Sequence, residues 1–395
     1  MLYFDFKGEK ISKLGFGCMR FINDPATGEV DQALANEMFA YALANGVNYF
    51  DTSYGYLGGK SELIIAEALA SYPRESYYLA DKFVGHCLPG PIDNKKLVEV
   101  SLRKCRTDYF DFYLLHNVTE WSAQFYDSDE YHIISDLAEL KEAGVLRHLG
   151  FSFHGGPRLL EYLLTKYEGI FEFVQIQCNY LDWSLQHADQ VYEIIRKHGL
   201  KAWIMESVRG GRLAVLPEDE AAALGSYTPG KSVASHGFRF VQGLDNASVI
   251  LSGMNSMEQL RDNIETFSRL EPAGPEEREA LFAIAERIKR DAGCVPCITD
   301  QIKGPEGMNL PTFVDCYNSY KVSRGVTTTM RLDGFADDKK PPAFAGAQWP
   351  EGSVYGGIDY REVLGELAEL YRNAPQWTEN HRNPAQRISR DIGLI

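Results

Sequence analysis

Short apolar runs alternate with amphipathic stretches along most of this chain, and this alternation constrains the fold more than any other feature. A parallel strand needs a crossover segment before the next strand can pair with it, so the alternation predicts a parallel sheet covered by helices. Eight repeats predict closure into a (β/α)8 TIM barrel. The apolar runs lie at Leu14–Cys18, Val47–Asp51, Tyr77–Lys82, Phe112–His116, His148–Phe153, Phe173–Cys178, Ala202–Ser207 and Ser248–Ser252. The stretches with helical periodicity lie at Gln32–Ala44, Ser61–Ser71, Asn94–Cys105, Tyr131–Ala143, Pro157–Lys166, His187–Lys197, Ser232–Val241 and Met257–Phe267.

The alternative α/β architecture is an open, doubly wound sheet that binds a dinucleotide at a glycine-rich first turn. Gly15-Phe16-Gly17 resembles the start of such a turn. The third glycine is absent at the required offset, and no acidic residue ends a second strand at the distance expected for a ribose contact. The barrel is therefore the favoured prediction.

Segments at both ends fall outside the repeat. Leu2–Phe6 and Lys10–Lys13 predict an N-terminal hairpin that would plug the bottom of the barrel, and Glu276–Lys289 predicts a closing helix. We expect a barrel domain at residues 1–290 and a small helical C-terminal extension at 291–395, with helices near Thr312–Tyr320 and Tyr360–Asn373.

The charge balance narrows the possible partners. The 395 residues carry 40 Lys and Arg against 55 Asp and Glu, a formal charge of −15. Such a chain repels nucleic acid and anionic lipid. No apolar run is long enough to cross a bilayer, and the N-terminus lacks a signal-peptide pattern, so a cytoplasmic location is expected. The sequence leaves the oligomeric state open.

Ionisable residues stand at the ends of three consecutive predicted strands. Asp51 ends the second apolar run, Lys82 the third and His116 the fourth, while Tyr56 lies in the loop after Asp51. In a parallel barrel the carboxyl ends of the strands meet at one mouth, where reactive groups gather. Taken singly, each has an ordinary structural interpretation, such as a helix cap, a solvated charge or a core histidine. Their joint placement favours a catalytic site.

These four groups suit proton delivery to a carbonyl oxygen. A tyrosine has an ordinary pKa near 10, and a cationic Lys82 within reach would lower the pKa of Tyr56 and make it a usable general acid and base. Asp51 would hold Lys82 charged. His116 would donate a hydrogen bond to the substrate oxygen and orient it.

Three segments resemble the signature blocks of the aldo-keto reductase superfamily: FDTSYGYLGGKSE, LADKF and DYFDFYLLHN. The family order of Asp, Tyr, Lys and His falls on Asp51, Tyr56, Lys82 and His116. The resemblance runs from Lys13 to about Phe267 and implies hydride transfer between a nicotinamide cofactor and an aldehyde, ketone or sugar-type substrate. Two alternatives stay open: a non-catalytic NAD(P)-binding regulatory subunit, and a sugar-hydroxyl oxidoreductase that retains its NAD.

The resemblance also assigns residues to the cofactor. It implies that Ser152 and Gln175 bind the carboxamide, although Phe153 stands where many members have Asn. It implies that a glycine-rich loop after the seventh strand binds the pyrophosphate, and that the segment after the eighth strand binds the adenosine. The remaining residues implied at the cofactor are Ser207, Arg209, Gly210, Gly211, Arg212, Gly253, Gln259 and Asn263.

The choice between NADP and NAD depends on one substitution. Many NADP-selective members have Lys where this chain has Gly253, so the usual charge for a 2′-phosphate is missing. Arg261 or Arg212 could supply it instead. The family resemblance favours NADP, and NAD is the alternative.

The C-terminal part resembles a subgroup whose ferredoxin-like extension binds an iron–sulfur cluster through closely spaced cysteines. Here Cys294-Val295-Pro296-Cys297 is followed by no further cysteine until Cys316, inside a predicted helix. A four-iron cluster needs four thiolates or close substitutes, so no iron–sulfur cluster is expected. A zinc site at Cys294 and Cys297 lacks a second ligand pair at suitable spacing. The sequence predicts no metal site.

Overall fold

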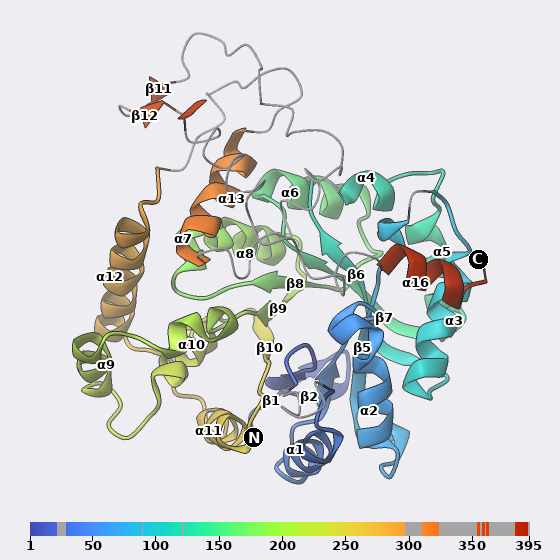
Figure 1. The fold of residues 1–395 in the computed structure, drawn as a ribbon, viewed down its shortest axis with the longest axis horizontal. Helices are drawn as coiled ribbons and strands as arrows, with labels where there is room; N and C mark the ends of the chain where they lie inside the picture. The colour runs from blue at the N-terminus through green and yellow to red at the C-terminus, as the bar shows by residue number, and fades with distance from the viewer. Residues whose placement is uncertain are drawn as a thin grey trace.

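The computed structural model describes residues 1–21, 29–88, 90–120, 122–296, 310–323, 354–355, 358–359, 361–362 and 384–393. Within these ranges eight parallel strands form a closed barrel in the order β10-β3-β4-β5-β6-β7-β8-β9 (Figure 1). The (β/α)8 prediction is therefore confirmed. The strands are β3 (Leu14–Gly17), β4 (Tyr49–Asp51), β5 (Tyr78–Phe83), β6 (Phe110–Val118), β7 (Leu146–Phe153), β8 (Phe173–Gln177), β9 (Lys201–Met205) and β10 (Ala247–Ser252).

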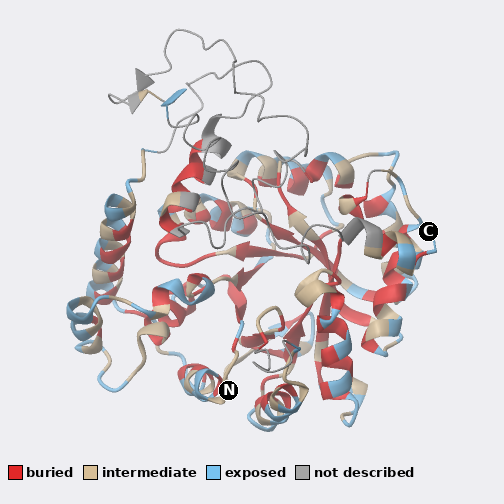
Figure 2. Cartoon of the chain, viewed as in Figure 1, coloured by how far each residue is buried: buried red, intermediate tan, exposed pale blue. Residues whose placement is uncertain are grey.

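Helices surround the barrel on the outside and bury their apolar faces against it, as the distribution of buried residues in Figure 2 shows. Local signals set their ends. Helix α1 begins where the Asp31 side chain accepts a hydrogen bond from the Leu34 N–H at 2.9 Å, and it stops before Gly46, whose φ is 86°. The helices between successive strands, and after the last, are α1 (Gln32–Ala44), α2 (Ser61–Leu69), α3 (Asn94–Cys105), α5 (Ile133–Glu142), α6 (Pro157–Lys166), α8 (Ala188–Lys197), α10 (Val233–Gln242) and α11 (Met257–Thr266).

The loops at the barrel ends contain short helices that the periodicity did not predict. Each of these elements has only three to eight residues, which is too few to show a clear 3.6-residue period. These elements are α4 (Ala123–Tyr126), α7 (Asp182–Leu185), α9 (Glu218–Gly225) and the 3-10 turns η1 (Tyr56–Gly59), η2 (Arg74–Ser76), η3 (Gly85–Cys87) and η4 (Arg209–Ala214).

The N-terminal hairpin closes one end of the barrel, as predicted. It consists of β1 (Tyr3–Phe6) and β2 (Glu9–Ser12). The Phe6 ring inserts among barrel side chains, with centroids 5.0 Å from Trp203 and 5.8 Å from Phe112. Because aromatic rings fill this end, substrate access is left to the opposite end, where the strands terminate.

After the barrel, α12 (Pro275–Ala292) packs Leu281 and Ile288 into the core, and α13 (Leu310–Ser323) lies beside α7 and α12 (Figure 1). The chain then includes the short pair β11 (Val354–Tyr355) and β12 (Ile358–Asp359) and the helix α16 (Pro384–Asp391). Most of the helix predicted at Tyr360–Asn373 lies outside the described residues. Cys297 also lies outside them. None of the helices in the described ranges is long and apolar enough to cross a membrane.

Helix α16 packs against α3 and η3, next to the loop that follows β4. The Tyr54 hydroxyl donates a hydrogen bond to the Asp391 carboxylate at 2.5 Å, and the Arg387 guanidinium lies 5.1 Å from the centre of the Tyr54 ring. A Cβ on Gly59 would lie 2.8 Å from Arg387 Nε, so only glycine fits there without a shift. The C-terminal segment thus contacts the loop that carries Tyr56.

Candidate active site

The four residues predicted at the barrel mouth come together in the structure. Asp51 is the last residue of β4, Lys82 lies near the end of β5, His116 lies near the end of β6, and Tyr56 begins η1 in the loop after β4. Strands β4, β5 and β6 are consecutive neighbours in the barrel, and their parallel direction brings these ends to one side.

Lys82 and Asp51 form an ion pair in the interior. The Lys82 side chain is fully buried, its ammonium contacts the Asp51 carboxylate, and it donates a second hydrogen bond to the Thr52 carbonyl oxygen at 2.7 Å. Burial alone would lower the pKa of Lys82, but Asp51 and Tyr56 outweigh this effect and raise it. Lys82 is therefore held as a cation, as the sequence predicted.

Tyr56 lies between the ion pair and His116. The Lys82 ammonium is 4.9 Å from the centre of the Tyr56 ring, and the His116 ring is 5.6 Å from it in an edge-on arrangement. Lys82 acts on the pKa of Tyr56 in the predicted direction. The predicted net lowering is nevertheless wrong for this structure, because burial of the hydroxyl outweighs Lys82 and raises the pKa of Tyr56 to about 12.

His116 is held by two polar neighbours. Its Nδ1 shares a hydrogen bond with the Ser53 hydroxyl at 2.9 Å, and its backbone carbonyl accepts one from the Tyr126 hydroxyl at 2.6 Å. Burial and the Lys82 charge lower the pKa of His116 far below its ordinary value. The imidazole is thus neutral at pH 7, and with Nδ1 engaged by Ser53, its Nε2 is the ring nitrogen left for the substrate side.

The residues implied at the carboxamide lie on β7 and β8. Ser152 and Gln175 are paired across these strands, both are buried, and Ser152 Oγ accepts a hydrogen bond from the Asn117 N–H at 2.8 Å. Within the described part of the chain, the side-chain oxygens of Gln175, Asn117 and Ser207 are buried without hydrogen-bond partners. Such acceptors are costly unless a ligand supplies donors, so they fit the amide hydrogens of a nicotinamide carboxamide.

Asn117 was not among the predicted residues. It directly follows His116, and its backbone adopts a φ of 55°, a conformation that asparagine tolerates better than most residues. One signal in the sequence could have identified it. Phe153 stands where many family members have an Asn amide, and Asn117 offers an amide on β6, the strand next to the one that carries Phe153.

The glycine-rich loop after β9 has the backbone that close approach to a ligand requires. Gly210 and Gly211 have φ values of 60° and 91°. Arg209 does not add an open charge there, because its guanidinium is buried and bonded to the Asp182 carboxylate at 2.5 Å. Its role beside the pyrophosphate stays a prediction. Arg212 is exposed.

The segment after β10 divides into exposed and buried residues. Gly253 and Gln259 are exposed, whereas Asn263 is buried and donates a hydrogen bond to the Ser252 hydroxyl at 2.9 Å. The Gln259 side-chain oxygen accepts one from the Asn255 N–H at 3.0 Å. Asn263 therefore orients the end of β10, and Gln259 is the more accessible of the two.

A buried cluster behind β5 is the single group of three potential metal ligands found among the described residues. The ligand atoms of Glu62, Asp81 and Cys105 lie within 4.8 Å of one another. Lys104 already forms an ion pair with Glu62. Burial, then the Glu62 charge, raises the pKa of Asp81, and burial raises the pKa of the Cys105 thiol. Burial therefore favours the neutral forms of Asp81 and Cys105, and the Lys104 ammonium is the cation next to this cluster.

This cluster predicts opposite effects of two substitutions. The pKa of the Asp81 carboxyl is higher in the folded protein than in the unfolded chain. The folded state therefore loses stability as the pH rises above the ordinary pKa of an aspartate. Asp81→Asn removes this loss and should raise the free energy of unfolding at pH 8 by about 1 kcal/mol. Lys104→Met leaves the buried Glu62 carboxylate without its cation and should lower the free energy of unfolding by about 3–5 kcal/mol. Urea unfolding at pH 5 and pH 8 measures both, and a destabilised Asp81→Asn protein at pH 8 would contradict the assignment.

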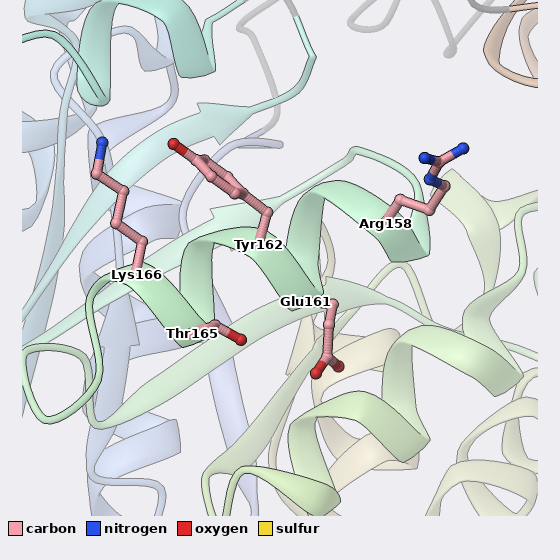
Figure 3. A pocket seen from close by; sticks show the side chains of 5 residues that line it. All are labelled: Arg158, Glu161, Tyr162, Thr165 and Lys166. Carbon is pink, nitrogen blue, oxygen red and sulfur yellow. The ribbon is translucent and has the colours of Figure 1, made fainter.

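An open pocket of about 460 Å³ lies along helix α6 (Figure 3). All five lining residues, Arg158, Glu161, Tyr162, Thr165 and Lys166, belong to the single helix α6. Tyr162 and Lys166 are bonded to Asp127. The pocket brings no predicted catalytic group together, so the barrel mouth is the candidate site.

Known proteins resemble this chain over the barrel. The sequence profile of the aldo/keto reductase family matches residues 13–274. A probable aldo-keto reductase of Glycine max is 26% identical over 206 residues, which are 49% of this chain and 55% of that protein, so the match spans about half of its length. The L-galactose dehydrogenase of Arabidopsis thaliana is 25% identical over 305 residues, covering 71% of this chain and 93% of that protein.

A solved structure supports the same relationship. The holo form of an aldo-keto reductase from Bacillus halodurans superposes with a TM-score of 0.56 at 25% identity, over 70% of this chain and 93% of that one. The matched residues 13–274 contain the whole barrel from β3 to β10 and all four residues at its mouth. The chain therefore belongs to the aldo/keto reductase family.

Proposed function

We propose that this protein transfers a hydride between a nicotinamide cofactor and the carbonyl carbon of a small aldehyde, ketone or sugar-type substrate, with Tyr56 as general acid and base. The observation that carries the proposal is the buried Lys82–Asp51 ion pair next to Tyr56, with His116 on the other side of the Tyr56 ring. A non-catalytic cofactor-binding protein has no need of a buried charge beside a tyrosine hydroxyl.

The cofactor fits the unpartnered acceptors at the carboxyl ends of β6, β8 and β9. Gln175 and Ser152, together with Asn117 in place of the amide missing at Phe153, would hold the carboxamide and fix which face of the ring meets the substrate. Gly210 and Gly211 would let backbone N–H groups approach the pyrophosphate. A reduced nicotinamide, when bound, supplies the hydride.

The four mouth residues would handle the oxygen. The neutral His116 donates a hydrogen bond from Nε2 and orients the carbonyl, which adds stabilisation where negative charge develops. Tyr56 delivers the proton to the same oxygen. The Lys82 charge, fixed by Asp51, favours the tyrosinate that remains. In the oxidative direction the same tyrosinate accepts the hydroxyl proton.

A panel of substrates tests this function. The purified protein should oxidise NADPH or NADH in the presence of some members of a set of aldoses, 2-oxoaldehydes and aromatic ketones, as monitored at 340 nm. Cofactor binding without turnover of any of them would favour the regulatory subunit. A protein that retains bound NAD after gel filtration, and turns over sugars without added cofactor, would favour the sugar-hydroxyl oxidoreductase with retained NAD.

We further propose that residues 1–290 form the barrel domain and that residues 291–395 form the C-terminal extension.

We also propose NADP(H) as the preferred cofactor. The phosphate of NADP needs Arg or Lys donors to offset its desolvation, and Arg212 and Arg261 are exposed on the segments after β9 and β10. The Arg261 guanidinium lies 5.6 Å from the centre of the Tyr41 ring.

The cofactor preference gives a direct prediction. NADPH should bind more tightly than NADH, and Arg261→Ala or Arg212→Ala should raise the Kd for NADPH about ten- to a hundredfold, or about 1.4–2.8 kcal/mol, without changing the Kd for NADH. Fluorescence titration of both cofactors at fixed ionic strength measures this. If the parent protein prefers NADH and neither arginine matters, Gly253 marks an NAD enzyme.

A further inference from the structure

Arg20 extends across the rim of the barrel mouth toward the glycine-rich loop. It follows β3, and its guanidinium reaches the Glu206 carboxylate in the loop after β9, with 3.1 Å between Nη2 and Oε1. Strands β3 and β9 are not neighbours, because β10 lies between them. Arg20 therefore passes over the end of β10 to reach its partner.

Two glycines leave room for this path. A Cβ on Gly253 would lie 3.2 Å from Arg20 Cδ and 3.5 Å from its Cγ, so any larger residue would press on the aliphatic stem. A Cβ on Gly210 would lie 3.0 Å from the Arg20 Nη2. The stem thus rests on the position where many relatives carry Lys, and the charged head lies against the glycine-rich loop.

The ion pair that holds Arg20 is weak enough to exchange. The Arg20 side chain is 33% exposed and that of Glu206 is 24% exposed, and a single contact joins them. Such half-exposed pairs contribute about 0–1 kcal/mol. A guanidinium bound to a phosphate makes shorter, charge-assisted and often bidentate hydrogen bonds, so a phosphate at this place would compete well for Arg20.

We propose that Arg20 is a cofactor-binding residue that leaves Glu206 and binds the pyrophosphate of the nicotinamide dinucleotide. This inference rests on the proposed function. It assigns the pyrophosphate rather than the 2′-phosphate because the head of Arg20 lies at Gly210 and only its stem lies at Gly253. It also fills the gap left by Arg209, whose charge is neutralised by Asp182.

Glu206 has a defined part in this arrangement. Without a cofactor it holds the guanidinium over the loop, and its backbone has a φ of 59° that is uncommon for glutamate. Its backbone carbonyl accepts hydrogen bonds from the Asn179 side chain at 2.9 Å and the Arg209 N–H at 2.8 Å, which fix the turn. Once a phosphate takes Arg20, the Glu206 carboxylate lies near an anion, so it opposes binding and hastens release.

The test is a titration of the parent protein and four variants with NADPH and with NADH, monitored by quenching of tryptophan fluorescence. Arg20→Met keeps the stem and should raise the Kd about ten- to a hundredfold for both cofactors equally. Glu206→Gln should lower both Kd values several-fold, and the double variant should bind more tightly than Arg20→Met. The control Arg103→Met removes the same charge from the exposed face of α3 and should leave both values unchanged.

Each other outcome decides against the assignment. If Arg20→Met weakens NADPH alone, Arg20 serves the 2′-phosphate and the pyrophosphate assignment is wrong. If both Kd values stay at the parent level while the parent binds cofactor, the Arg20–Glu206 pair is only structural. If the parent protein binds neither cofactor, the proposed function fails, and this inference with it.

Discussion

Replacing Tyr56 by Phe is expected to lower kcat by about a thousandfold or more while changing the Kd for NADPH by less than about twofold. The substitution removes one hydroxyl and keeps the ring, whose contacts with Lys82 and His116 are retained. General acid catalysis acts on the transition state alone, so its loss appears in kcat and spares cofactor binding. Steady-state kinetics and a cofactor titration on the same preparation separate the two effects.

A matched control shows whether the effect belongs to this hydroxyl. Tyr227→Phe removes a hydroxyl from an exposed tyrosine outside the mouth and should leave kcat unchanged. If Tyr56→Phe loses activity only a few-fold, another group delivers the proton. His116 would then be the candidate to examine, because it is the other ionisable ring beside Tyr56.

The sequence predicted the barrel because its signal repeats. Each unit has an apolar run followed by a helical period, and a short strand such as Tyr49–Asp51 is recognised by its place between two helices more than by its own three residues. Helix α6 was placed with the observed ends because Pro157 marks its first turn and its apolar face is regular. The short helices α4 and α7 carried no such period and were missed.

The sequence predicted the location of those site residues that the order of the strands alone brings together. It did not predict the contacts that depend on how far a long side chain extends and in which direction. Asp51, Lys82 and His116 are carried to one mouth by consecutive parallel strands. The pairing of Arg209 with Asp182, and the crossing of Arg20 to Glu206, depend on rotamers and on small residues under the path. The pKa of Tyr56 is raised by burial and lowered by the Lys82 charge. The relative size of these two effects cannot be obtained from the sequence.

Lys82→Met is expected to have the second large effect, on both folding and catalysis. The ammonium is fully buried against Asp51, so its removal strands a carboxylate in the interior and should lower the free energy of unfolding by about 3–5 kcal/mol. Lys82 is also the main group that opposes the effect of burial on Tyr56. Without it the pKa of Tyr56 rises further, and kcat should fall by about a hundredfold or more.

The double variant Asp51→Asn with Lys82→Met separates these two consequences. Removing both charges relieves the stranded carboxylate, so most of the stability should return, whereas the tyrosine still lacks its cation and kcat should stay low. The pH dependence gives an independent check. In the oxidative direction, where Tyr56 must be ionised, the rise in rate should shift to higher pH in the double variant. If its profile overlays that of the parent protein, Lys82 only supports the fold and does not tune Tyr56.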